Sequence, residues 1–157
     1  MTLANPRFED SYGRIFGSDI GMDEGADEFF YAFYDRFLRD PGIAAMFENT
    51  DRDRQVSMLK KSLFQLVTYY VVGEPNAELD RLATVHERLG IDANAFDVWM
   101  EALVDTAADF DDQWSEATRL AWCWALAPGI AYMRLMSGAY RRVSDNNSSD
   151  TAPDKPH

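Results

Sequence analysis

The sequence predicts an all-α fold of about six to seven helices, built as one domain. Apolar residues recur at spacings of three and four along successive segments, Gly, Pro and Asn separate these segments, and no segment alternates as a strand does. The chain has 157 residues, of which 46% are hydrophobic and 13% aromatic. This length and composition indicate a folded chain with a substantial core, not a disordered one.

The first predicted helix has Phe8, Tyr12 and Phe16 on one face, and the Gly-containing stretch of residues 17–25 ends it. The second is rich in aromatic residues and stops before Pro41, because the residue before a proline avoids helical geometry. Its apolar face consists of Phe29, Phe30, Phe33, Tyr34, Phe37 and Leu38. We assign Phe29, Phe30 and Phe37 to the core. A tight turn is predicted over residues 41–47.

Two helices are predicted in the middle of the chain. A long amphipathic helix is expected over residues 56–70, closed by Gly73 and Pro75. The next helix places four residues on one stripe, with Gly90 where a C-terminal cap belongs: Leu79, Leu82, His86 and Leu89. This stripe predicts that His86 faces the interior.

Two further helices complete the prediction. The first has the apolar residues Phe96, Trp99, Leu103, Ala107 and Phe110. The last begins near Ser115 and is marked by Leu120, Trp124, Ala127 and Ala131. Pro128 lies inside it, removes one backbone hydrogen bond and predicts a kink. Between the two helices, Asp109, Asp111 and Asp112 are expected to form a solvated turn.

The domain organisation follows from where the helical patterns stop. Residues 1–144 are expected to form the folded domain. Residues 145–157 are rich in Asp, Asn, Ser and Pro and are predicted to be a disordered tail that includes His157.

Charge and cysteine content exclude several classes of function. Lys and Arg total 15 against 27 Asp and Glu, a formal net charge of -12, so attraction to nucleic acid or to an anionic membrane surface is not expected. The N-terminus lacks a signal-peptide pattern, and no apolar run is long enough to span a bilayer. These features predict a cytoplasmic protein. The single Cys123 offers no internal disulfide or thiolate cluster, and we interpret it as a small core or surface residue.

His86 is the candidate for chemistry within the folded part of the chain. A single histidine on an apolar stripe is more often a hydrogen-bonded core residue than a metal ligand, so its context decides. Two segments provide that context. One contains Phe33, Tyr34, Asp35, Arg36, Asp40, Pro41 and Phe47, and the other contains Val85, His86, Glu87, Arg88, Leu89, Gly90, Ile91, Phe96 and Trp99.

These segments resemble bacterial globins over most of residues 26–136. The first is similar to the second globin helix and the corner after it, and the other to the proximal helix and the start of the next one. The resemblance implies a globin domain that binds haem b, with His86 as the iron ligand. It also implies that Phe47 packs on the porphyrin and that Tyr34 faces the bound ligand.

The same resemblance implies the other haem contacts. Gln55 falls at the distal polar position of the long helix, and Leu59 at the apolar distal contact one turn later. Ile91 and Phe96 correspond to proximal contacts. The predicted haem-binding set is completed by Leu63, Leu82 and Trp99.

The subfamily is left open between two arrangements. Trp99, and the thirteen residues from Tyr34 to Phe47, resemble truncated haemoglobins. The chain lacks the Gly-Gly pairs of that group, and its complete first and last helices favour the longer three-over-three arrangement over the two-over-two one.

Three predicted ligand-side residues have ordinary alternatives. Tyr34 could cap the aromatic core, Gln55 could point to solvent, and Trp99 could serve packing with its indole nitrogen satisfied locally. Hydrogen-bond donors beside a bound diatomic ligand would strengthen its binding, and all three side chains have a donor.

The expected function is reversible binding of dioxygen, nitric oxide or carbon monoxide, as in oxygen transport. Nitric oxide dioxygenase or peroxidase-like activity is compatible with the same site. No reductase segment follows in this sequence, so we expect electrons to come from a separate reductase. Two alternatives stay open: a haem-free globin-fold signalling module, and a gas sensor that acts through a partner, with a homodimer formed by the apolar residues of the last helix.

Overall fold

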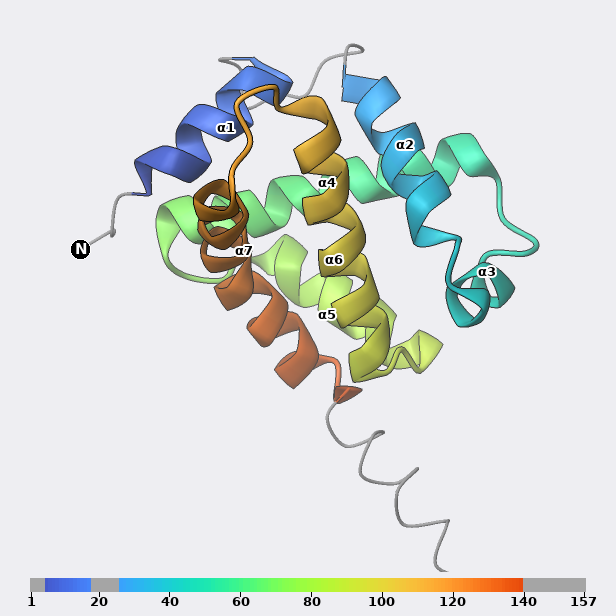
Figure 1. Cartoon of the computed structure of the whole chain (residues 1–157). Helices are drawn as coiled ribbons and strands as arrows, with labels where there is room; N and C mark the ends of the chain where they lie inside the picture. The colour runs from blue at the N-terminus through green and yellow to red at the C-terminus, as the bar shows by residue number, and fades with distance from the viewer. Residues whose placement is uncertain (1–4, 18–25, 140–157) are drawn as a thin grey trace, which may run out of the picture.

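A computed structural model describes residues 5–17 and 26–139. Within these residues it contains helices and no strands, which confirms the all-α prediction (Figure 1). The helices are α1 (Pro6–Phe16), α2 (Asp27–Phe37), α3 (Pro41–Met46), α4 (Arg52–Val72), α5 (Ala77–Leu89), α6 (Ala93–Phe110) and α7 (Glu116–Met136). The disordered tail predicted for residues 145–157 lies outside the described residues.

Short polar side chains begin most of the helices. Six N-cap side chains accept a hydrogen bond from a backbone N–H of the first turn, which would otherwise have no partner inside the helix. These residues are Asn5, Asp40, Asp51, Asn76, Asp92 and Ser115. The ends of α4 and α5 agree with the sequence prediction, because Gly73 and Gly90 adopt left-handed φ values of 83° and 68°.

The predicted turn at residues 41–47 is wrong, because most of it is the short helix α3. Pro41 occupies the first turn of this helix, where its missing N–H costs nothing. The Asp40 side chain accepts from the Ile43 backbone N–H at 3.1 Å. The same proline therefore ends one helix and begins another.

Helix α7 is the centre of the packing, since α1, α4, α5 and α6 all lie against it. It crosses α4 at Gly129, where an added Cβ would lie 2.6 Å from Leu66 Cδ2. Any larger residue at position 129 would therefore require the Leu66 side chain to move. The described residues include complete first and last helices, the feature that favoured the three-over-three arrangement.

The buried face of α7 differs from the one that the sequence suggested. Leu120 and Trp124, which marked the predicted stripe, are 54% and 70% exposed. The inward face instead contains Trp122, Leu126 and Met133. Helical spacing is satisfied by both faces, so it could not identify the inner one.

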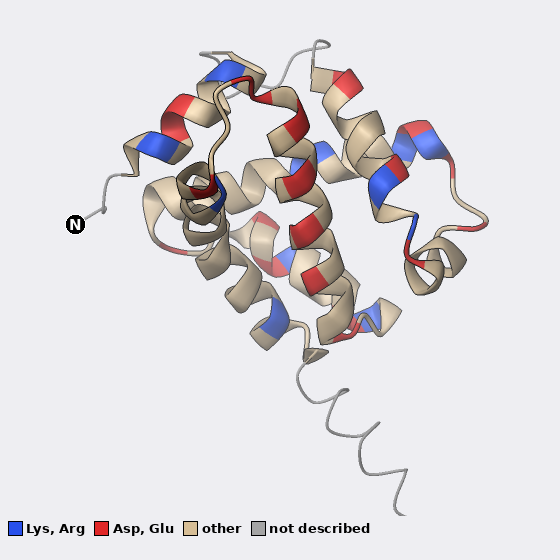
Figure 2. Ribbon diagram, in the orientation of Figure 1, with Lys and Arg blue, Asp and Glu red and all other residues tan. Residues whose placement is uncertain are grey.

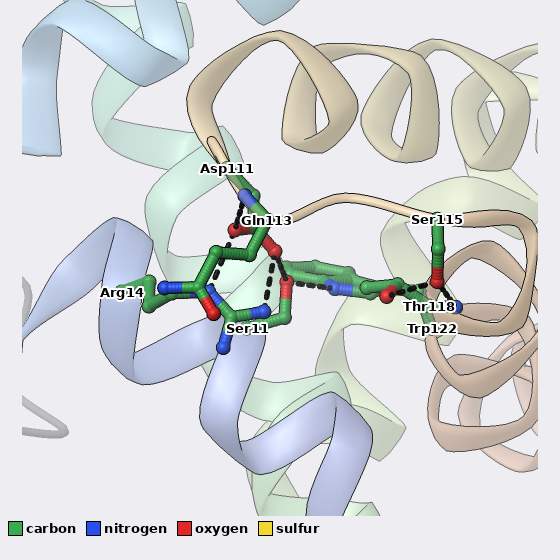
Figure 3. A network of polar contacts seen from close by, with 7 residues as sticks. All are labelled: Ser11, Arg14, Asp111, Gln113, Ser115, Thr118 and Trp122. Carbon is green, nitrogen blue, oxygen red and sulfur yellow. Dashed lines mark hydrogen bonds and ion pairs between the residues drawn. The ribbon is translucent and has the colours of Figure 1, made fainter.

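The expectation of a solvated turn for Asp109, Asp111 and Asp112 is wrong for Asp111, which is buried at the corner between α6 and α7. Its carboxylate accepts hydrogen bonds from Ser11 Oγ at 2.6 Å and from Arg14 Nε at 2.6 Å. Ser11 Oγ in turn accepts from Trp122 Nε1 at 2.9 Å (Figure 3). This polar network holds α1 against the corner and α7.

No helix in the described part of the chain has the length and hydropathy needed to cross a bilayer. Cys123 is half-buried on α7 and makes no disulfide.

Candidate functional site

A cavity of about 320 Å³ lies among α3, α4, α5, α6 and α7, and the end of α2 also contributes to its lining. Its walls are mostly aliphatic and aromatic. The lining residues are Phe37, Ile43, Met46, Phe47, Thr50, Gln55, Met58, Leu59, Ser62, Leu66, Leu79, Leu82, Val85, His86, Leu89, Ile91, Ala95, Phe96, Trp99, Ile130 and Met133. Cofactor and small-molecule sites have volumes of about 300 to 1,000 Å³ and the same apolar character.

The structure brings most of the predicted haem contacts to this cavity. Its lining includes eight of the ten: Phe47, Gln55, Leu59, Leu82, His86, Ile91, Phe96 and Trp99. They come from α4, α5, α6 and the short segments beside α3 and α6. Residues that are 52 positions apart in sequence, such as Phe47 and Trp99, therefore line the same cavity.

Tyr34 and Leu63 are placed outside the lining. Leu63 is fully buried in the core. Tyr34 is also buried, and its ring lies edge-on to Phe47 with centroids 6.0 Å apart. The Arg52 guanidinium lies over the Tyr34 ring, 5.6 Å from its centroid. Tyr34 thus supports Phe47 from behind and does not line the cavity.

His86 is the imidazole of the cavity, and its orientation is fixed from within its own helix. His86 Nδ1 lies 2.7 Å from the Leu82 carbonyl oxygen, one turn earlier in α5. A carbonyl oxygen can only accept, so Nδ1 bears the hydrogen and donates it. The ring also stacks on Phe96, with centroids 5.6 Å apart and an angle of 30° between the planes.

These contacts leave the ring in a form suited to binding a metal. Burial lowers the pKa of His86 below its ordinary value, while the bond to Leu82 opposes that change. The ring is therefore neutral at neutral pH. With Nδ1 donating, Nε2 holds the lone pair that a metal ion would require.

The other polar groups of the lining divide into two kinds. Thr50 Oγ1 donates to the Phe47 carbonyl oxygen at 2.7 Å, and Ser62 Oγ donates to the Met58 carbonyl oxygen at 2.9 Å. Because both hydroxyl groups donate to backbone carbonyl oxygens, they do not donate to a ligand in the cavity. The Gln55 amide and the Trp99 indole are the remaining donors in the lining. Trp99 also packs edge-on against Phe33, with centroids 5.5 Å apart.

Several lining residues were not identified from sequence. Phe37 was assigned to the core alone, and it both packs in the core and lines the cavity. Ile130 and Met133 come from the end of α7 and are distant in sequence from every residue of the predicted set. No local pattern distinguishes them from other core residues, because only the crossing of α7 over α4 and α5 brings them to the cavity.

Comparison with solved structures gives a close match. A protein of Pseudomonas aeruginosa PAO1, whose crystal structure is described as structurally highly homologous to a human hemoglobin, matches with a TM-score of 0.71 and 32% sequence identity. The match covers 86% of this chain and 98% of that one. No protein-family model matches the sequence, and no curated protein matches it.

Proposed function

This chain belongs to the haemoglobin-like globin family, and we propose that it binds haem in the cavity, with His86 as the iron ligand. The family follows from 32% identity over nearly the full length of a haemoglobin-like structure, and the prediction of a globin fold is confirmed with it. The cofactor and its contacts are our proposal.

The orientation of His86 is the observation on which the proposal rests. Histidines that bind metals almost always donate their other ring N–H to a carbonyl or carboxylate, which fixes the tautomer and raises the basicity of the ligating nitrogen. The bond from Nδ1 to the Leu82 carbonyl provides this arrangement. A core histidine with a purely structural role would not need an apolar cavity beside it.

The rest of the cavity fits a haem. The porphyrin is a broad apolar ring, and apolar side chains of six helices, α2 to α7, line the space that it would occupy. Phe96 stacks on His86, and Phe47 also lines the cavity. When bound, haem supplies iron that takes diatomic ligands, and the protein controls access and polarity around it.

We further propose that Gln55 and Trp99 are the donors toward a diatomic ligand such as dioxygen, nitric oxide or carbon monoxide. Both side chains line the cavity, whereas Tyr34 lies behind Phe47. The role of Tyr34 is then to position Phe47. The interval from Tyr34 to Phe47, which resembles that of truncated haemoglobins, would then reflect the contact between these two rings.

Reversible gas binding is the function that this site supports best. A nitric oxide dioxygenase or peroxidase-like activity would use the same residues together with a separate reductase. We expect these reactions in the cytoplasm. The alternatives are a haem-free signalling module, which the haem titration below separates from the proposal, and a gas sensor, which would bind haem and act through a partner.

Haem titration of the purified chain tests the proposal directly. The wild-type protein is expected to bind one haem with a strong absorption band. His86→Ala should weaken binding by more than about 10-fold, since even the loss of a hydrogen-bond partner of a metal ligand costs about 10- to 100-fold in metal affinity. Arg88→Ala is the matched control, since Arg88 is exposed on the same helix and does not line the cavity. An unchanged titration in His86→Ala would contradict the proposal, and absence of haem binding in wild type would favour the haem-free module.

Dioxygen release tests the donor assignment. Trp99→Phe and Gln55→Leu should each accelerate release, by about 10-fold for loss of a hydrogen bond of about 1.4 kcal/mol. Tyr34→Phe should change the rate much less, because Tyr34 does not line the cavity. Stopped-flow measurement of the three variants distinguishes the assignments, and a larger effect of Tyr34→Phe would return the donor role to Tyr34.

A further inference from the structure

The outer face of α7 carries an apolar stripe that the monomer leaves open. The stripe consists of Leu120, Trp124, Ala127, Ala131 and Leu135, and all five side chains are exposed. Trp124 and Leu135 are 70% and 67% exposed. These residues recur at spacings of three and four over about 22 Å of helix. A tryptophan this exposed within such a stripe is typical of an interface.

A groove of about 500 Å³ runs beside the stripe, between α6 and α7. Ala127 and Ala131 belong to both the stripe and the groove. Met100, Val104 and Ile130 provide the apolar part of its floor. The stripe therefore has one large exposed ring, that of Trp124, and the groove lies beside the small side chain of Ala131.

Four of the stripe residues form two pairs that are symmetric about the point between Ala127 and Pro128. Leu120 and Leu135 are equally distant from that point, and so are Trp124 and Ala131. A two-fold axis there would align α7 with the α7 of a second copy in the opposite direction. Leu120 would then meet Leu135 of the second copy, and Trp124 would meet the small Ala131. Large side chains facing small ones is the arrangement that close packing between helices requires.

Charges on this face also suit a second copy. Each chain has a formal net charge of -12, which opposes association elsewhere on the surface. At the groove, Arg119 pairs with Asp105 near one end, and Arg134 pairs with Asp97 near the other. Figure 2 shows the acidic residues repeated along α6, with basic positions on the neighbouring α7.

In the antiparallel arrangement, the Arg119–Asp105 pair of one copy would lie near the Arg134–Asp97 pair of the other. Each end of the interface would then combine two positive and two negative charges, without net repulsion. Glu101 lines the groove between these pairs and offers a carboxylate to the indole N–H of the entering Trp124.

We propose that the outer face of α7, with the groove beside α6, is a symmetric homodimer interface in which Trp124 of each copy inserts beside Ala131 of the other. This inference does not depend on haem binding. Isologous contacts of this kind are the commonest way in which soluble proteins form dimers.

Sedimentation of the full-length purified protein tests the interface. Wild type should be dimeric at micromolar concentration, and Trp124→Ala should weaken dimerisation by at least about 30-fold, as for loss of a buried aromatic anchor. Val72→Ala is the matched control, because Val72 is 58% exposed at the end of α4 and outside the stripe. A dimer that is weakened equally by both variants would overturn the proposal.

An exchange of the two residues tests the register. Ala131→Trp alone should also weaken the dimer, because two indole rings would compete for one space. The double variant Trp124→Ala with Ala131→Trp should dimerise more tightly than either single variant, since each large side chain again meets a small one. A double variant no tighter than the single ones would exclude this pairing.

Cross-linking supplies a measurement that does not rely on altered packing. In a Cys123→Ser background, Ala127→Cys lies beside the two-fold axis and should form a disulfide between copies on mild oxidation. Ser57→Cys, exposed on α4, is the control and should not. A wild-type protein that is monomeric at micromolar concentration, or a cross-link no more efficient at position 127 than at position 57, would overturn the proposal.

Discussion

Two helices of this protein have similar apolar stripes that end in opposite environments. On α5, Leu79, Leu82 and His86 face the cavity. On α7, Leu120 and Trp124 face outward. Both stripes have the same spacing of three and four residues.

The comparison shows that periodicity identifies a helix and one coherent face but not the partner of that face. Helix α5 has charged residues opposite its stripe, so only one side of it can be buried. Helix α7 is apolar around much of its circumference, and its inner side is chosen by Trp122, whose indole N–H binds Ser11 of α1. Its outer stripe is left for solvent or for a second copy.

The largest expected effect separates two tryptophans of α7 that are two positions apart. Trp122 is fully buried, so Trp122→Ala should lower the free energy of unfolding by about 3 to 5 kcal/mol through the cavity it creates. Trp124→Ala should lower it by less than about 1 kcal/mol, because Trp124 is 70% exposed. Urea denaturation at a dilution that favours monomers measures both. Similar losses in the two variants would mean that the faces of α7 have been assigned wrongly.

An intermediate effect is expected where α1 meets the inner face of α7. The Arg14 guanidinium and the Ser11 hydroxyl hold the pKa of Asp111 at about 2, below its ordinary value of 3.8. Asp111→Asn should therefore cost about 2 kcal/mol near neutral pH, as for hydrogen bonds to a charged group. Asp109→Asn is the control and should cost less than about 1 kcal/mol, because the carboxylate of its ion pair with Arg36 is exposed.

The sign of the pH dependence follows from the lowered pKa. The charged form of Asp111 stabilises the fold above pH 3.8, and this contribution is lost as pH falls toward 2. Acid titration followed by circular dichroism should show the loss in wild type. An equal acid response in Asp111→Asn would contradict this role.

The smallest effect concerns the titration of His86 on α5. Burial lowers its pKa, so the unfolded chain binds a proton more readily than the folded chain does. Stability and haem retention should therefore decline as pH falls below about 6.5, the ordinary pKa of histidine. Absorption spectra over this range measure the release of haem. Haem retention that improves on acidification would contradict the neutral form of His86.

Much of the fold could be predicted from local sequence. Gly73 and Gly90 identified the ends of α4 and α5, and Ser115 identified the start of α7. These predictions succeed because caps satisfy backbone groups within one turn. The predicted turn after Pro41 was wrong because a proline suits the first turn of a helix as well as the end of one.

The candidate site was predicted only in part. The resemblance to globins selected eight residues that share the cavity, His86 among them. It did not select Ile130 or Met133, and it assigned Tyr34 a place toward the ligand that the cavity lining does not include. Asp111 was assigned to a solvated turn because nothing beside it in sequence reveals Ser11 and Arg14, which lie about 100 positions away.

The sequence by itself determined an all-α fold and a histidine on an inward helical stripe, because both depend on contacts within a few turns of one helix. Only the tertiary structure decided which face of α7 is buried and which side chains reach His86. Those choices depend on helices from distant parts of the chain, such as α1 against α7 and α4 against Gly129. A helical period describes a cylinder, and its neighbours determine which side of it becomes the core.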